Sequence, residues 1–238
     1  MEERQGIRMT SYIDYTSPET EFTYDLNNNT TFKKDPYNYF NLLSVKQLNT
    51  LTNLSLLDIF LSKGNVIEPH YHQNAAELVY CISGAAEIAL LNPFSNELLH
   101  FYVEPGQVVN IPQGWWHYEI AAVDQTHLLA IFDASIPDVI YGSDILRLTP
   151  PNVLAYTYCL DEEKLKNTLA PLTKTVVFGP PSNCSYNSVH GQVTNKPQTK
   201  QAYIQPVINH VNQVNHVNQA NQSHYNQMYG HQHRQQQY

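Results

Sequence analysis

Short apolar runs separated by polar turns fill residues 37–148 of the chain. Within most runs apolar and polar residues alternate, which is the period of a β-strand with one buried face. Several short strands at this spacing indicate an antiparallel sandwich or barrel. The runs that predict strands are 54–62, 77–83, 85–91, 97–103, 107–112, 115–121 and 127–132.

The pattern changes in residues 149–181. Thr149 precedes two prolines, which suits a helix N-cap followed by prolines in the first turn. Asp161 likewise precedes an amphipathic run, "LDEEKLKNTL". We therefore expect two short helices after the strands.

The two ends of the chain are polar. Residues 1–36 predict a poorly ordered arm with room for one short strand. Residues 182–238 are rich in Asn, Gln and His, and they have too little apolar surface to offset the entropy lost on ordering. We expect this segment to be a disordered tail.

Charge and cysteine content narrow the function classes. The formal net charge is −8, from 13 basic and 21 acidic residues, so neither nucleic acid nor an anionic membrane is expected as a partner. Three cysteines without a spacing pattern favour neither a disulfide framework nor a cysteine-based zinc site. The beginning of the sequence lacks the apolar region of a signal peptide, and no run is long enough to span a bilayer. The expectation is a soluble protein kept inside the cell.

The stretch "GNVIEPHYHQNAAELVYCISG", residues 64–84, contains candidate metal ligands. His70 and His72 leave the same face of a strand, and Glu77 begins the next apolar run. His117 follows a tight turn before a further strand. Imidazole and carboxylate groups brought together from several strands suit a hard or borderline divalent cation. We predict these four residues as ligands of one six-coordinate ion, with two positions open to small molecules.

Two half-motifs carry a family resemblance. The first is G-x5-H-x-H-x4-E-x6-G from Gly64 to Gly84, and the second is G-x5-P-x-G-x2-H from Gly106 to His117. Both match the cupin signature, and residues 40–181 resemble germin-like and oxalate-decarboxylase-like single-domain cupins. The resemblance implies an all-β jelly-roll barrel (a double-stranded β-helix) followed by short C-terminal helices. It also implies manganese, or alternatively iron, and a homo-oligomer, either a dimer or a hexamer.

The substrate that the resemblance implies is a small organic acid, as in oxalate decarboxylases and oxidases. Two positions depart from the family. Ile67 stands where decarboxylases have arginine and germins asparagine, and Ala121 stands where germins have asparagine. Because both polar groups would contact a small dicarboxylate, the substrate stays open between a small organic acid and another small oxygen-bearing molecule.

Glu119 is the candidate catalytic residue. Alternation along its strand places Glu119 and Ala121 on the same face as His117. Glu119 would then orient a metal ligand or act as a general base, with a pKa raised by burial. The alternative is a partly exposed carboxylate at the rim or in an ion pair. His100 and His127 have no partner at ligand spacing and are interpreted as structural.

Two function classes remain. One is a metal-dependent enzyme, a decarboxylase or an oxidoreductase. The other is a non-enzymatic structural or assembly protein. The tail favours this class, because its Gln and Tyr residues can be cross-linked and it resembles the tails of proteins on bacterial spore surfaces. The expected location is therefore the cytoplasm or a spore surface. The tail also holds six histidines that can bind metals weakly: His190, His210, His216, His224, His231 and His233.

Overall fold

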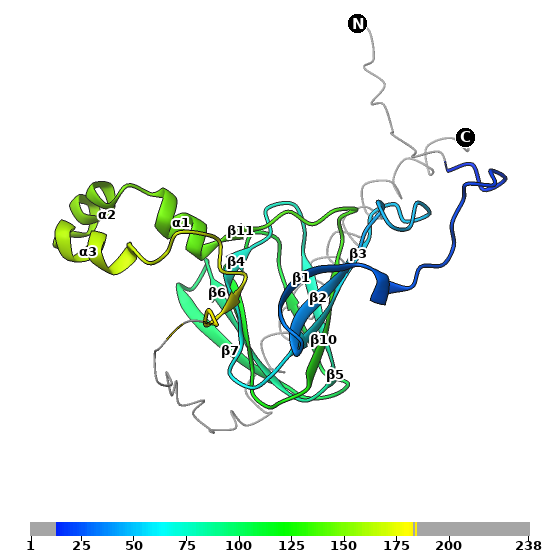
Figure 1. The fold of residues 1–238 in the computed structure, drawn as a ribbon, viewed down its shortest axis with the longest axis horizontal. Helices are drawn as coiled ribbons and strands as arrows, with labels where there is room; N and C mark the ends of the chain where they lie inside the picture. Colours follow the sequence, from blue (N-terminus) through cyan, green and yellow to red (C-terminus); the bar gives the residue numbers. More distant parts are fainter. Residues whose placement is uncertain (1–12, 183, 185–238) are drawn as a thin grey trace, which may run out of the picture. The chain divides into compact units, whose positions relative to one another are not determined.

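The computed structural model describes residues 13–182 and Cys184, which belong to one compact unit, Met1–Ser185. Two antiparallel sheets face each other and form a barrel, with three short helices to one side (Figure 1). The all-β prediction with C-terminal helices is confirmed. The predicted disordered tail, residues 182–238, lies outside the described residues except for positions 182 and 184.

Each of the two sheets has six strands. The first sheet has the order β1 (Thr30–Asp35), β2 (Asn38–Leu43), β3 (Ser55–Leu61), β10 (Thr126–Phe132), β5 (Glu77–Ser83) and β8 (Val108–Ile111). The second has the order β11 (Ile140–Tyr141), β4 (Val66–Tyr71), β9 (His117–Ala121), β6 (Ala86–Asn92) and β7 (Glu97–Val103), and β12 (Phe178–Gly179) pairs with β4. A 3-10 turn, Leu26–Asn28, precedes β1.

The seven predicted strands are all present, and β5 and β7 agree with the prediction end to end. The short strand expected in the polar arm is β1, which pairs with β2 at the edge of the first sheet. The apolar pattern did not indicate β2, β11 or β12. It also did not indicate β4, because Glu68, Pro69 and His70 interrupt its apolar positions.

The alternating pattern of each strand fills the space between the sheets. Along β10 every second residue from Thr126 to Phe132 is buried, and the residues between them are half-buried. Large apolar side chains of both sheets meet in this core, each contributing about 1.5–3 kcal/mol by burial. The largest of them include Phe132, Ile59, Leu61, Ile88 and Leu128.

Glycines allow two of the turns that bring the strands together. Gly84, between β5 and β6, has a φ of +75°, and a Cβ there would lie 2.6 Å from the Cα of Thr126. Gly114 has a φ of +79° in the turn directly before β9. Both positions therefore need a residue without a side chain.

Three helices follow the barrel: α1 (Gly142–Leu148), α2 (Pro151–Tyr158) and α3 (Glu162–Leu169). The helices α2 and α3 were predicted, and Asp161 caps α3 by accepting a hydrogen bond from the Lys164 N–H at 3.0 Å. The prediction for Thr149 was wrong. Because α1 occupies the preceding residues, Thr149 ends that helix and donates to the Ile145 carbonyl, and Pro150 takes the N-cap of α2.

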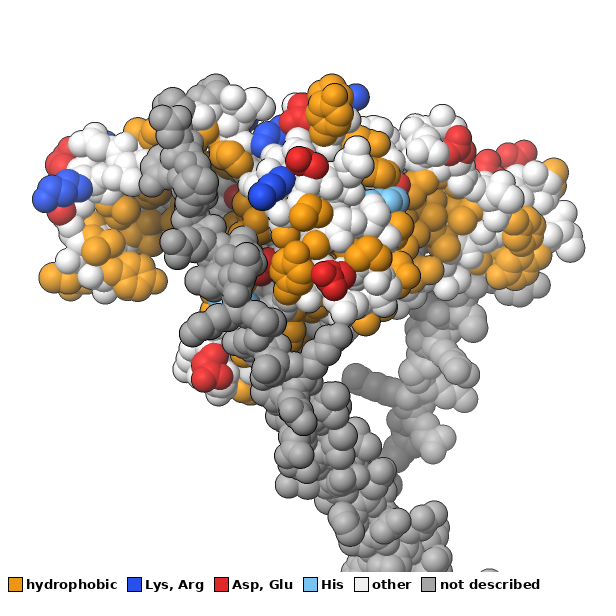
Figure 2. Space-filling model, turned by 90° about the horizontal axis from the view of Figure 1, so that it is seen from below, with side chains coloured by type: hydrophobic (Ala, Val, Ile, Leu, Met, Phe, Trp, Pro, Cys, Tyr) orange, Lys and Arg blue, Asp and Glu red, His pale blue; other side chains and the backbone are white. Residues whose placement is uncertain are grey.

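The three helices form a projection at one side of the barrel, called here the helical projection. It carries exposed apolar side chains, and Figure 2 shows hydrophobic groups gathered on it. They include Val153, Tyr156, Tyr158 and Leu160. Within the described part of the chain, none of the helices has the length and apolar character needed to cross a membrane.

Candidate metal centre

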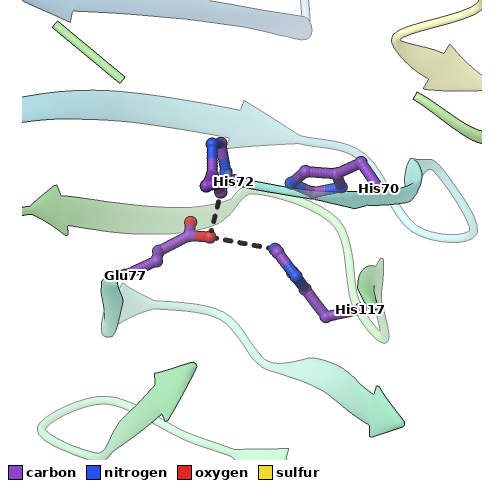
Figure 3. A group of neighbouring side chains, drawn as sticks. All are labelled: His70, His72, Glu77 and His117. Atoms are coloured by element: carbon purple, nitrogen blue, oxygen red, sulfur yellow. Dashed lines mark ion pairs between the residues drawn. The ribbon is translucent and has the colours of Figure 1, made fainter. Parts of the chain in front are cut away.

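The four predicted ligands come from three strands. His70 lies on β4 and pairs with His117, the first residue of β9, in the second sheet. His72 directly follows β4, and Glu77 begins β5 in the opposite sheet. All four side chains are buried and point toward one another between the two sheets (Figure 3).

The ligand atoms are close enough to share one ion. One nitrogen or oxygen atom of each residue lies within 4.8 Å of those of the other three. Oε2 of Glu77 is 2.9 Å from Nε2 of His117 and 3.4 Å from Nε2 of His72 (Figure 3). The tertiary structure thus brings together the set that the spacing predicted.

Backbone carbonyl oxygens orient all three imidazoles. Nδ1 of His70 lies 2.7 Å from the carbonyl oxygen of Glu68, and Nδ1 of His117 lies 2.9 Å from that of Trp115. Nδ1 of His72 lies 2.7 Å from the carbonyl oxygen of Asp138. A carbonyl oxygen only accepts hydrogen bonds, so each Nδ1 carries the proton.

In the neutral rings, the Nε2 atoms therefore present lone pairs to the centre. Nε2 of His72, Nε2 of His117 and Oε2 of Glu77 are buried without a hydrogen-bond partner. Lone pairs at these distances from a carboxylate repel it unless a cation or an added proton lies between them. The donor set is therefore the one that a divalent cation satisfies.

The family assignment follows from a comparison with known proteins. Residues 26–166, more than half of the chain, match the family model described as Cupin. The chain belongs to the cupin family.

Relatives and solved structures extend this result. A germin-like protein, subfamily 2 member 1, from Arabidopsis thaliana is 28% identical over 123 residues, which are 50% of this chain and 55% of that protein. The chain thus spans about half the length of this relative. Procruciferin, an 11S globulin from Brassica napus, has a TM-score of 0.63 and 20% identity over 71% of this cupin and 45% of that chain. The Bacillus subtilis oxalate decarboxylase, studied for its Mn(II) centres, has a TM-score of 0.59 and 22% identity over 76% of this cupin and 48% of that chain.

Burial and mutual charge shift the pKa values of this cupin's cluster. Burial, followed by the neighbouring His117, lowers the pKa of His70 well below its usual value. Burial also opposes protonation of His72, but the Glu77 carboxylate outweighs it and raises the pKa of His72. Burial would raise the pKa of Glu77, but its contacts with His117 and His72 outweigh that effect and lower it. The centre thus holds an ionised carboxylate among imidazoles.

Glu119 lies in the same interior as the cluster. Its side chain is buried, and its Oε1 is 3.9 Å from Nε2 of His117. Burial and then the charge of Glu77 raise the pKa of Glu119 well above its usual value. The residue is therefore not an exposed carboxylate at the rim.

The sequence did not indicate several residues that surround the cluster. The ring of Phe132 packs edge-on against His72, with centroids 4.8 Å apart. The ring of Tyr141 lies 5.8 Å from that of His70, and burial raises the pKa of its hydroxyl. Phe132 ends a predicted strand and could have been expected to face inward. Tyr141 lies in a segment where the sequence predicted no element.

Helix α1 supports the backbone beside His70. The buried carboxylate of Glu68 accepts hydrogen bonds from the Ser143 N–H at 3.1 Å and from its hydroxyl at 2.6 Å. The carbonyl of the same Glu68 accepts from His70. A pocket of about 290 Å³ adjoins this contact, and none of the four clustered residues lines it. Its apolar lining includes Trp116, Ile145, Leu146, Leu172 and Val176.

Proposed function

We propose that His70, His72, Glu77 and His117 bind one divalent cation, manganese or iron, in a germin-like cupin that acts on a small oxygen-bearing molecule. Small organic acids are the first class to test. The observation that carries the proposal is the fixed proton position on the imidazoles, which directs unpaired Nε2 atoms of His72 and His117 at the Glu77 carboxylate.

The donor set supports manganese or iron. Three imidazoles and one carboxylate suit first-row divalent ions, and they leave two positions of a six-coordinate ion for other ligands. Mn(II) occupies the centres of the structurally similar Bacillus subtilis oxalate decarboxylase. The bound ion would supply Lewis-acid or redox chemistry to a small molecule at the open positions.

The residues themselves restrict what can react. His70 and His72 are 4% and 6% exposed, so only small molecules have access to the cluster. Ile67 and Ala121, which are both buried, offer no side-chain hydrogen bond to a dicarboxylate. This cupin therefore lacks, at these two positions, the polar groups expected for oxalate, and the substrate panel must extend beyond oxalate.

Metal content tests the proposal directly. Untagged full-length protein is purified without chelators, and its metals are measured by elemental analysis beside an electron paramagnetic resonance (EPR) spectrum. We expect about one manganese or iron per chain at a site of defined symmetry. A panel of small acids and neutral oxygen compounds is then assayed with Mn²⁺ and dioxygen.

The histidines of the tail can also bind metal, so a variant is needed that removes only a ligand of the cluster. His72→Ala should lose the defined EPR signal and the stoichiometric metal, and His100→Ala should keep both. His100 is a matched control because it lies on β7 and contacts Glu87 instead of the cluster. Wild-type protein without stoichiometric metal, or His72→Ala with an unchanged spectrum, would contradict the proposal.

The exposed side chains of the helical projection support a second candidate, an assembly role through homo-oligomers, either dimers or hexamers. Tyr156 is 92% exposed and Leu160 is 51% exposed, and clustered exposed apolar groups mark interaction surfaces. The double variant Tyr156→Ser, Leu160→Ser should lower the mass measured by light scattering. Phe94→Ser, at an 89% exposed position on the β6–β7 turn, should not. Equal masses for all three proteins would contradict this role.

A further inference from the structure

The loop between β10 and β11, residues 133–139, contributes a backbone group to the metal cluster. The carbonyl oxygen of Asp138 accepts the Nδ1 proton of His72 at 2.7 Å, although the two residues are 66 positions apart in the sequence. The rings of His70 and His117 differ, because each is oriented by a carbonyl only two residues away. The direction of the His72 ring therefore depends on where this loop is held.

Asn74 connects the loop to the segment that carries His72. Its Nδ2 donates a hydrogen bond to the Ile136 carbonyl at 2.9 Å, and its Oδ1 accepts one from the Asp138 N–H at 2.8 Å. The side chain thus binds the backbone on both sides of Pro137. Because one partner only accepts and the other only donates, one orientation of the amide satisfies both.

These contacts are not those of an ordinary turn asparagine, which bonds to backbone groups near itself. Asn92, at the end of β6, is of the ordinary kind, since its Oδ1 accepts from the Phe94 N–H. Asn74 is exposed, and its two partners are 62 and 64 positions away in the sequence. Its side chain therefore fixes the position of a distant loop.

The first half of the loop has hydrogen bonds of its own. Oδ1 of Asp133 accepts from the Ala76 N–H at 2.8 Å, and the carbonyl of the next residue accepts from the Ser55 hydroxyl at 2.6 Å. Neither contact involves the side chain of Asn74. Its removal should therefore release residues 136–138 and leave the start of the loop in place.

We propose that Asn74 is a positioning residue of the metal centre, which holds the Asp138 carbonyl in place and thereby keeps Nε2 of His72 free for the cation. The effect on the cation rests on the proposed function. Without the carbonyl, Nδ1 of His72 loses its fixed acceptor. The ring proton then relocates to Nε2 by exchange with water and donates to the Glu77 carboxylate, whose Oε2 is 3.4 Å away. The cation must break this hydrogen bond before it binds.

The tautomer of His72 tests the inference without any metal. Long-range proton–nitrogen NMR spectra of the imidazole rings are recorded on metal-free, full-length wild type and Asn74→Ala in alkaline buffer, where the rings are neutral. The variant His72→Ala identifies the signals of His72. Wild type should carry the proton on Nδ1, and Asn74→Ala should gain a population with the proton on Nε2. An unchanged tautomer would overturn the inference.

Metal affinity provides the second test, with Asn49→Ala as the matched control. Asn49 is also exposed and also uses both amide atoms, donating to the Glu19 carbonyl at 2.6 Å and accepting from the Glu21 N–H at 2.9 Å. In EPR titrations of the full-length proteins, Asn74→Ala should weaken Mn²⁺ binding by about tenfold, because it disturbs the partner of a metal ligand. Asn49→Ala should leave the affinity unchanged. Equal Mn²⁺ affinity in wild type and Asn74→Ala would also overturn the inference.

The proposed function and this inference fail differently. If wild type does not bind Mn²⁺ with a defined spectrum, the proposed function fails, and the NMR spectra still decide whether Asn74 positions His72. If wild type binds and Asn74→Ala behaves identically, only the inference fails. Should Asn74→Ala not fold by circular dichroism, Asn74→Ser keeps a polar side chain suited to a turn but too short to bridge both backbone groups. An unchanged tautomer in Asn74→Ser would then overturn the inference.

Discussion

Histidine–carboxylate contacts occur both inside the barrel and on its outer surface. Inside, His72 and His117 both face Glu77. Outside, on the first sheet, Nε2 of His127 on β10 contacts Oδ1 of Asp58 on β3. The outer pair is 23% and 16% exposed, and the inner residues are almost fully buried.

The two regions differ in which imidazole nitrogen donates its proton, and to which acceptor. His127 donates from Nε2 to the Asp58 carboxylate, so the contact is complete. In the centre, the Nδ1 protons of His72 and His117 are used by carbonyl oxygens, and Nε2 of each neutral ring cannot donate to Glu77. The same residue types therefore make a complete hydrogen bond in one place and an open ligand set in the other. Four predictions sharpen this contrast.

The largest effect should come from Glu77. At Mn²⁺ concentrations of 100 times the dissociation constant, binding adds about 2.7 kcal/mol to wild-type stability, or roughly 5–10 °C in melting temperature. Glu77→Gln should weaken binding by more than about 100-fold and abolish this rise, which thermal melting with and without Mn²⁺ measures. Asp58→Asn should retain the rise. A Glu77→Gln protein that is still stabilised by Mn²⁺ would contradict the difference between the buried cluster and the outer His127–Asp58 pair.

The second prediction concerns pH. Because the pKa of His72 is raised above its usual 6.5, the metal-free centre takes up an added proton at Nε2 of His72 more readily near neutral pH than an ordinary histidine does, and metal binding must displace this proton. Mn²⁺ affinity should therefore rise with pH through this range, by about tenfold per pH unit for each proton released. EPR titrations between pH 5.5 and 8, roughly spanning this transition, measure the slope. His127→Asn should show the same slope, and a flat profile would count against the prediction.

A smaller effect is expected from Ser143, which contacts Glu68 from α1. Ser143→Ala removes a hydroxyl from a buried carboxylate and should cost about 1–3 kcal/mol of unfolding free energy. Because the carbonyl of Glu68 orients His70, Mn²⁺ affinity should also fall, by about tenfold. Chemical denaturation and EPR titration measure the two effects. Ser83→Ala removes an exposed hydroxyl on β5 that donates to the Gln125 carbonyl, and it should leave Mn²⁺ affinity unchanged. Unchanged Mn²⁺ affinity in Ser143→Ala would refute the link through α1.

The smallest effect should come from the outer pair. His127→Asn and Asp58→Asn should each lower stability by about 0.2–1 kcal/mol, since both partners remain in contact with solvent. A double-mutant cycle by urea denaturation isolates the pair, and Mn²⁺ binding should stay unchanged throughout. A coupling above about 3 kcal/mol would show that the outer pair behaves as a buried one.

Much of the barrel could be predicted because the alternation of apolar and polar residues along a strand shows which of its faces is buried. On β9, alternation alone places His117, Glu119 and Ala121 on one face, and the structure has all three buried. The strand β4 lacks this alternation, because polar residues and Pro69 interrupt it. Only the spacing of its histidines indicated a strand there. Helix α1 was missed because its residues carry no cap signal like that of Asp161.

The sequence by itself determined the strand faces, the turns that need glycine and the four ligand types at their spacing. These features depend on backbone geometry over a few residues. Only the tertiary structure decided that Glu77 meets the histidines from the opposite sheet and that the Asp138 carbonyl, 66 residues from His72 along the chain, sets the proton position of its ring. Sheet pairing decides such contacts, because it joins segments whose separation along the chain carries no information about their distance in space.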